Sequence, residues 1–112
     1  MEAAVFGGEL RRSRLPVENM GDDDLWIFVE PYGEDYWLKP GDVFTVAPEV
    51  EGIDVWFSTA VCPEGITVWL YEDGDPTKVV LKYTVSDADG TRLECGHQRP
   101  PKPAGWSTPE PG

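Results

Sequence analysis

Residues 25–46 read LWIFVEPYGEDYWLKPGDVFTV, and this stretch decides the fold class. Side chains alternate along residues 25–30, so Leu25, Ile27 and Val29 point to one face of a strand and the residues between them to the other. The sequences PYGED and KPGD that follow are typical of turns, because Pro fixes φ and Gly accepts positive φ. The stretch therefore predicts a β-meander with strands at residues 25–30, 36–38 and 43–47.

The same two-residue period recurs along the rest of the chain. Eleven Pro and twelve Gly residues separate short runs of Val, Ile and aromatic residues, which favours strands and turns over helices. Pro16 cannot donate to a ladder, so residues 9–19 fit an edge strand. Seven to eight short strands predict an all-β fold, an antiparallel β-sandwich of jelly-roll or cupin-like type. The further strands are expected at residues 53–61, 66–72, 78–85 and 91–97.

The 112 residues fit one domain. We expect a loose lead-in at residues 1–8, a β-sandwich at residues 9–98 and a disordered proline-rich tail at residues 99–112. The N-terminus lacks the features of a secretory signal, and no apolar run approaches the roughly 18 residues of a membrane span. A cytoplasmic protein without a membrane partner is expected. Two cysteines are too few for a disulfide framework, although they could form one bridge.

The charge is strongly acidic and unevenly distributed. Nine Lys and Arg residues stand against 21 Asp and Glu residues, a net charge of −12. Residues 18–75 contain 15 acids and one base, Lys39, so this segment carries −14 and the remainder +2. Such a field repels nucleic acids and anionic membranes and attracts basic partners. The same acids would also keep an aromatic-rich protein soluble, so both explanations stay open.

A second set of residues projects from the strands on the side opposite the predicted core, which consists of Leu25, Ile27, Val29, Val55, Phe57, Ile66, Val68 and Leu70. Monomers seldom expose a large apolar patch without using it. A subunit interface, a platform on which planar or sugar rings stack, and a barrel exterior packed against loops would each explain such a face. Phe44 is expected on this face as well. The predicted binding residues are Trp26, Phe28, Glu30, Trp37, Trp56, Trp69 and Tyr71.

His97 is the only histidine and lies two residues after Cys95, which would place both side chains on one face of a strand. With Cys62 from another turn they could form a three-ligand transition-metal site. No fourth ligand is defined by spacing, and a structural cysteine beside a hydrogen-bonded histidine explains the same residues. No cofactor is therefore predicted. The DADG sequence at residues 87–90 is similar to the start of a calcium loop, but a hairpin turn suits it better.

Two resemblances bear on the fold. The Pro-Gly-Asp turn at residues 40–42 resembles a local element of cupin and cupredoxin barrels, but the chain lacks the histidines that both metal sites need. Over residues 17–97, the segments EPYGEDYWLKPGD and CGH resemble small uncharacterised all-β proteins of high-GC soil bacteria. That likeness implies no activity.

These observations favour a non-enzymatic protein-interaction module that binds a partner protein, or a second copy of itself, through its aromatic face. A small-molecule or carbohydrate-binding module using that face is the alternative. A cupin-like metal-dependent enzyme built on Cys62, Cys95 and His97 is a third hypothesis, although no nucleophile elbow or other local catalytic motif supports an enzyme.

Overall fold

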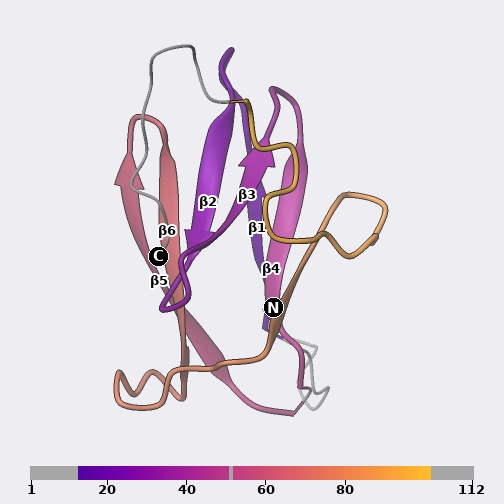
Figure 1. Cartoon of the computed structure of the whole chain (residues 1–112). Helices are drawn as coiled ribbons and strands as arrows, with labels where there is room; N and C mark the ends of the chain where they lie inside the picture. The colour runs from indigo at the N-terminus through magenta and orange to yellow at the C-terminus, as the bar shows by residue number, and fades with distance from the viewer. Residues whose placement is uncertain (1–12, 51, 102–112) are drawn as a thin grey trace, which may run out of the picture.

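The computed structural model describes residues 13–50 and 52–101, which form two β-sheets and no helix (Figure 1). One sheet has the strand order β1-β4-β7 and the other the order β3-β2-β6-β5. This architecture and its strand number confirm the predicted β-sandwich. No helix in the described part is long and apolar enough to cross a membrane. The strands are β1 (Leu15–Glu18), β2 (Leu25–Val29), β3 (Glu34–Leu38), β4 (Val43–Pro48), β5 (Val55–Cys62), β6 (Gly65–Glu72) and β7 (Tyr83–Ser86).

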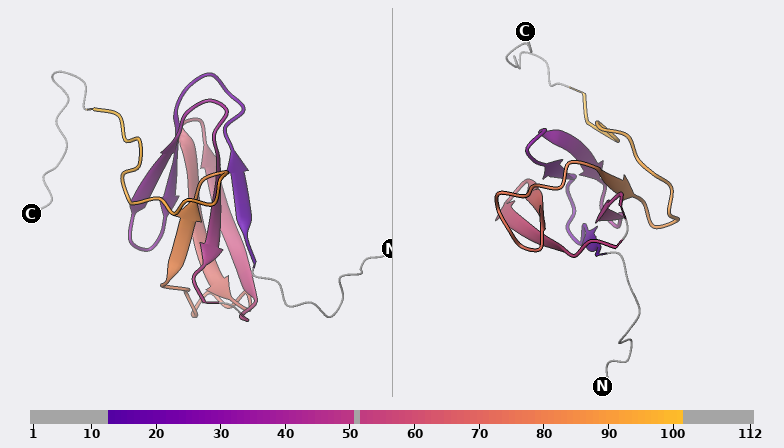
Figure 2. Two further views of the ribbon diagram at one scale, coloured as in Figure 1. Left: turned by 90° about the vertical axis from the view of Figure 1, so that its right-hand side faces the viewer. Right: turned by 90° about the horizontal axis from the view of Figure 1, so that it is seen from below.

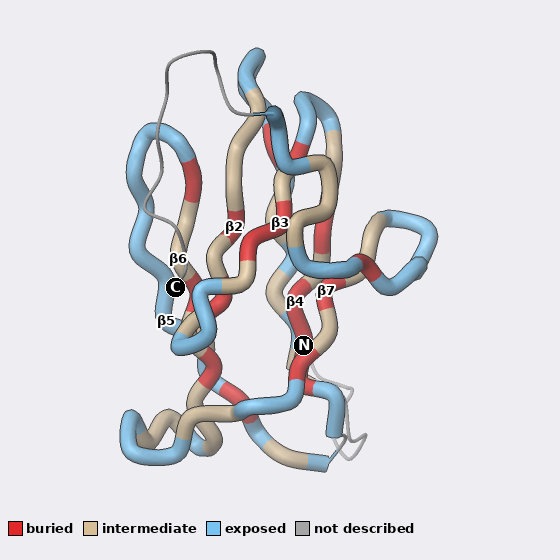
Figure 3. Tube along the Cα trace, viewed as in Figure 1, coloured by how far each residue is buried: buried red, intermediate tan, exposed pale blue. Residues whose placement is uncertain are grey.

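The hydrophobic core lies between the two sheets. Ile27 and Leu70 from the four-stranded sheet meet Val46 and Val85 from the three-stranded sheet, and all four are essentially inaccessible to solvent. In Figure 3 the buried segments accordingly lie mostly in the strands, whereas most of the connecting loops and much of β5 are exposed. The predicted core positions are confirmed, since all of them belong to this cluster or pack against it: Leu25, Ile27, Val29, Val55, Phe57, Ile66, Val68 and Leu70.

The predicted meander is only partly correct. β2 and β3 form an antiparallel pair, but β4 leaves their sheet and pairs with β1 and β7 instead. Phe44 is consequently 2% exposed and lies in the core, so its prediction as an outward aromatic residue was wrong. Because β4 lies in the opposite sheet, its alternation turns Phe44 and Val46 toward the interior.

One ladder differs from the predicted antiparallel pattern. β2 pairs with β6 in parallel, from Trp26 opposite Gly65 to Val29 opposite Val68. The other four ladders are antiparallel. Period-two alternation specifies which face of a strand is buried, but not which strand lies beside it, so the sequence could not reveal this pair.

The last part of the chain is less regular than expected. In the predicted strand at residues 78–85, Val79 forms an isolated bridge with Tyr71, and only the end from Tyr83 onward joins a ladder. Residues 91–97 form two isolated bridges in place of a strand. The chain turns at Gly96 and Gln98, which both have positive φ. This C-terminal segment runs along the outside of the sandwich (Figure 2).

The predicted ends of the domain can be compared only in part. β1 corresponds to the second half of the predicted strand at residues 9–19. The lead-in at residues 1–8, residues 9–12 and residues 102–112 of the predicted tail lie outside the described residues.

Candidate functional site

The outer face of the four-stranded sheet gathers the predicted aromatic residues. Residues directly opposite one another in a ladder point to the same face of a sheet. The pairs are Trp26 with Trp37, Trp26 with Gly65, Phe28 with Thr67, Ser58 with Trp69, and Trp56 with Tyr71. All six aromatic residues therefore point away from the core, and we call this surface the aromatic face.

Trp26 occupies the centre of the aromatic face and lies flat on the sheet. A Cβ atom built on Gly65 would approach the Trp26 indole to within 2.4 Å, so the ring covers the space that a side chain at position 65 would need. On its own strand, Trp26 stacks on Phe28 with ring centroids 4.4 Å apart and an interplanar angle of 27°. The two rings thus cover one another face to face and form one compact apolar cluster.

Acidic side chains hold two further tryptophans at the margins of the aromatic face. The Trp37 indole Nε1 donates to Asp35 Oδ2 at 2.8 Å, and the Trp56 Nε1 donates to Asp54 Oδ2 at 3.2 Å. The Trp56 ring also covers Gly74, where a Cβ atom would come within 2.8 Å of it. Trp56 is nevertheless 61% exposed. The Trp56 ring, bordered by the Asp54 carboxylate, is therefore presented to solvent.

Glu30 follows β2 directly and extends the ladder, because its backbone N–H donates to the Val68 carbonyl oxygen at 2.9 Å. Alternation after Val29 places it on the side of the aromatic face, as predicted from the sequence. Phe28, Trp69 and Glu30 are half-buried.

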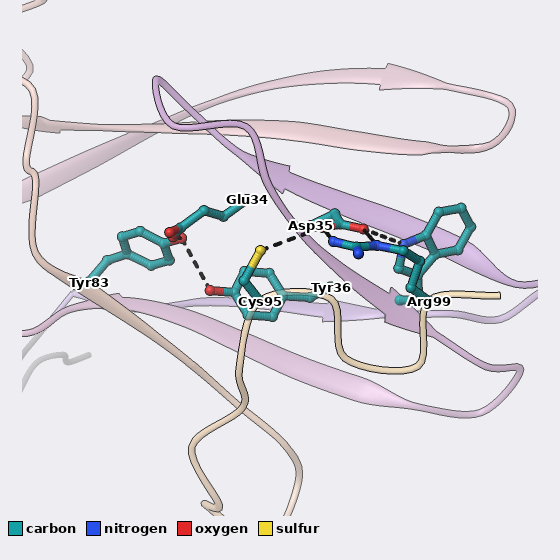
Figure 4. A network of polar contacts seen from close by, with 7 residues as sticks. Glu34, Asp35, Tyr36, Tyr83, Cys95 and Arg99 are labelled. Carbon is teal, nitrogen blue, oxygen red and sulfur yellow. Dashed lines mark hydrogen bonds and ion pairs between the residues drawn. The ribbon is translucent and has the colours of Figure 1, made fainter. Parts of the chain in front are cut away.

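Asp35 is the centre of a polar network that the sequence did not predict (Figure 4). Its carboxylate accepts hydrogen bonds from Arg99 Nε at 2.8 Å and Arg99 Nη2 at 2.5 Å, and from the Cys95 thiol at 3.5 Å. The Asp35 carbonyl oxygen accepts the Gly96 N–H at 2.6 Å. The guanidinium of Arg99, aided by Trp37, lowers the pKa of Asp35 to about 2 although burial opposes the shift. The network fastens the C-terminal segment to the edge of β3.

A second polar cluster, made of two tyrosine hydroxyl groups and a glutamate, lies beside this network (Figure 4). The Tyr83 hydroxyl donates to the Glu34 carboxylate, and the Tyr36 and Tyr83 hydroxyl oxygens are 3.2 Å apart. Burial raises the pKa of both phenols, and the neighbouring Glu34 carboxylate raises it further. Both tyrosines are therefore protonated donors at neutral pH, and they link β3 to β7 across the sandwich.

A groove of about 590 Å³ opens beside these hydroxyl groups, a volume within the range of small-molecule sites. Residues of both charge signs line it, among them Glu34, Glu94 and Lys82. Arg92 and Glu49 form an exposed ion pair at 3.8 Å, which contributes little energy. The Tyr36 and Tyr83 hydroxyl groups are paired with one another, so packing between the sheets explains these two groups without a ligand.

The three candidate metal ligands have separate contacts. The Cys62 thiol, at the end of β5, donates to the Gly65 carbonyl oxygen at 3.5 Å, and the Cys95 thiol contacts Asp35. The His97 ring packs edge-on against Phe44 with centroids 5.5 Å apart. Both cysteines are exposed and free. In residues 13–50 and 52–101 no three His, Cys, Asp or Glu side chains are placed to hold a metal ion.

Sequence reasoning missed Asp35 and Arg99 because their partnership joins residues 64 positions apart. Arg99 was assigned to the proline-rich tail, yet it is anchored to β3. The only local indication of the Arg99 contact was Gly96 in the sequence CGHQR. Gly96 leaves room for the Arg99 guanidinium, because a Cβ atom at position 96 would come within 3.1 Å of it.

Comparison of the chain with protein-family models, with curated proteins and with solved structures gave no match. The case for a function therefore rests on the geometry of the chain itself.

Proposed function

We propose that this protein is a non-enzymatic interaction module that binds a partner protein through the aromatic face. The observation that carries the proposal is the alignment of Trp26, Phe28 and Trp37 with the other three aromatic residues on one side of a single sheet. Aromatic residues are enriched where protein surfaces bury one another, since they supply much contact area with few rotatable bonds.

The charge of the chain favours a basic partner. Asp54 accepts the indole N–H group of the exposed Trp56, and Glu30 lies on the same side of the sheet, so acids border the apolar rings. A net charge of −12 accelerates the approach of a basic surface and slows that of an acidic one. Binding should therefore weaken as salt is added, and a second acidic copy seated on the same face is the less favourable occupant.

A carbohydrate or other small ring-containing ligand is the second candidate. The Trp56 ring covers Gly74 and is 61% exposed, which is the arrangement on which a planar or sugar ring could rest. Such a ligand would change tryptophan fluorescence without any change in the mass of the protein. A neutral oligosaccharide would also bind equally well at low and high salt.

Co-purification from the source organism tests the proposal. Three baits would be compared: the wild type, a Trp56→Ser/Trp69→Ser variant of the aromatic face, and a Met20→Ser/Leu81→Ser control. Met20 and Leu81 are also exposed apolar residues, 85% and 56% accessible, but they lie outside the aromatic face. We expect one protein that is retained by the wild type and the control and lost from the face variant. Identical sets of proteins on all three baits would contradict the proposal.

A further inference from the structure

β5 is an edge strand without the usual protection. It ends the order β3-β2-β6-β5, so in the described part of the chain no strand pairs with its outer side. Edge strands are normally shielded by charged residues, by proline or by shortness. The eight residues of β5, VWFSTAVC, include no charged residue and no proline. Residues 58–62 are exposed, and Val61 is 77% accessible.

The outward hydrogen-bonding groups of β5 follow from its ladder with β6. The Asp73 N–H donates to the Asp54 carbonyl oxygen at 2.8 Å, and hydrogen-bonded pairs alternate in an antiparallel ladder. The even-numbered residues of β5 therefore direct their N–H and C=O groups toward β6. The odd-numbered residues direct theirs outward, which agrees with the Val55 N–H donating to Ser13 Oγ at 3.2 Å. Phe57, Thr59 and Val61 thus present a row of donors and acceptors that no backbone group of residues 13–50 and 52–101 uses.

This row is complementary to itself. If two copies of β5 pair antiparallel around Thr59, Phe57 of one copy lies opposite Val61 of the other, and Ser58 lies opposite Ala60. Thr59 lies opposite Thr59. All three outward-directed residues then exchange both of their backbone hydrogen bonds, and every apolar side chain of the inner side meets another apolar or β-branched side chain.

We infer that β5 pairs with β5 of a second copy of this chain, antiparallel and centred on Thr59. Two four-stranded sheets then become one sheet of eight strands. In this register even-numbered residues lie opposite even-numbered residues, and opposite residues point to the same face of a sheet. The aromatic faces of the two copies therefore form one continuous surface. This inference rests on the edge of the sheet and does not depend on whether the aromatic face binds a partner.

The charges next to β5 oppose this pairing at low salt. In the same register Asp54 lies opposite Glu64 of the second copy, and each chain carries a net charge of −12. Screening of these repulsions strengthens the pairing as salt is added. Added salt should therefore strengthen the pairing of two β5 strands, whereas it should weaken the binding of a basic partner to the aromatic face. The two proposals can fail independently, and the salt dependence shows which of them has failed.

Cysteine cross-linking tests the register. In a Cys62→Ser/Cys95→Ser background, Thr59→Cys should form a disulfide-linked dimer under mild oxidation, since opposite residues have Cα atoms about 5.5 Å apart. Val61→Cys alone should not, because two residues 61 would be offset by four positions, roughly 14 Å along the strand. A mixture of Val61→Cys and Phe57→Cys chains should cross-link. Equal yields from Thr59→Cys and Val61→Cys would overturn the inference.

Light scattering across a dilution series tests the pairing itself. The solution mass of the wild type should approach twice the chain mass as the protein concentration rises. In about 0.5 M salt, which screens charges beyond a few ångströms, the dimer should form at a lower protein concentration than at low salt. Thr59→Lys places two ammonium groups opposite each other and should raise the dissociation constant at least tenfold. Thr91→Lys, the same substitution at an exposed loop residue, should leave it unchanged. A monomeric wild type at all concentrations, or equal effects of both variants, would overturn the inference.

Discussion

Arg99 binds both carboxylate oxygens of Asp35, through Nε to Oδ2 at 2.8 Å and Nη2 to Oδ1 at 2.5 Å. The Asp35 side chain is only 10% exposed, whereas that of Arg99 is 57% exposed. The pair joins β3 to the C-terminal segment, and Trp37 completes the contact from the aromatic face. One ion pair therefore connects the end of the domain with the surface proposed to bind a partner.

Removal of this pair should destabilise the fold. Arg99→Ala leaves a largely buried carboxylate with fewer donors, and we expect a loss of about 1–2 kcal/mol in the free energy of unfolding. Arg99→Lys should restore less than half of it, since an ammonium group cannot bind two oxygens with the same planar geometry. Chemical denaturation at pH 7 measures both. Equal stability of Arg99→Ala and the wild type would show that the contact contributes nothing.

The same carboxylate predicts a pH dependence. The pKa of Asp35 is lowered from 3.8 to about 2, so its contribution is present above pH 4 and is lost as pH falls from about 4 to about 2. This pKa shift corresponds to a contribution of roughly 2 kcal/mol to the free energy of unfolding. The contribution is smaller in practice because solvent screens the exposed Arg99. Denaturation curves between pH 2 and pH 5 should fall more steeply for the wild type than for Asp35→Asn. Parallel curves would contradict the assignment.

The buried phenols predict a second dependence at alkaline pH. The pKa values of Tyr36 and Tyr83 are raised from 10.0 by burial, so their contribution is present below pH 10 and declines as pH rises above it. The free energy of unfolding of the wild type should therefore fall between pH 10 and pH 11.5. A Tyr36→Phe/Tyr83→Phe variant should lose less over this interval, although it starts lower. An equal decline of the free energy of unfolding in both proteins would show that titration of Tyr36 and Tyr83 does not cause it.

Gly65 should be required for the position of Trp26. A Cβ atom there would approach the Trp26 carbonyl oxygen to 2.2 Å, so Gly65→Ala forces β2 and β6 apart. We expect a destabilisation of about 1–3 kcal/mol, typical of overpacking. Gly21→Ala is the matched control, since its nearest neighbour, Asn19 Oδ1, would lie at 3.5 Å. Thermal unfolding compares the two, and similar midpoints would mean that Trp26 can move aside without cost.

The sequence was informative wherever one face of a strand is buried. Alternation in residues 25–29 and 66–70 identified Ile27, Val68 and Leu70 as core residues, and the structure confirms them. The same alternation placed Trp26 and Trp69 outward. That these outward residues bind a partner is still a prediction, because solvent exposure follows from the pattern and function does not.

The sequence could not show how the strands associate. Phe44 turns inward because β4 pairs with β1 and β7, and β6 lies parallel to β2 although a long segment separates them. Asp35 and Arg99 are in contact although 64 positions separate them in the chain. Such long-range choices depend on the packing of whole sheets, and local alternation is the same for each possible neighbour.

Binding of the co-purified partner by calorimetry tests the central proposal most directly. Purified wild-type protein, Trp56→Ser/Trp69→Ser and Met20→Ser/Leu81→Ser would each be titrated with that partner at low and high salt. We expect the face variant to raise Kd by about 30-fold or more, as loss of interface hot spots does, and the control to match the wild type. Added salt should weaken wild-type binding. Equal Kd values for all three proteins would contradict the proposal that the aromatic face is the binding surface.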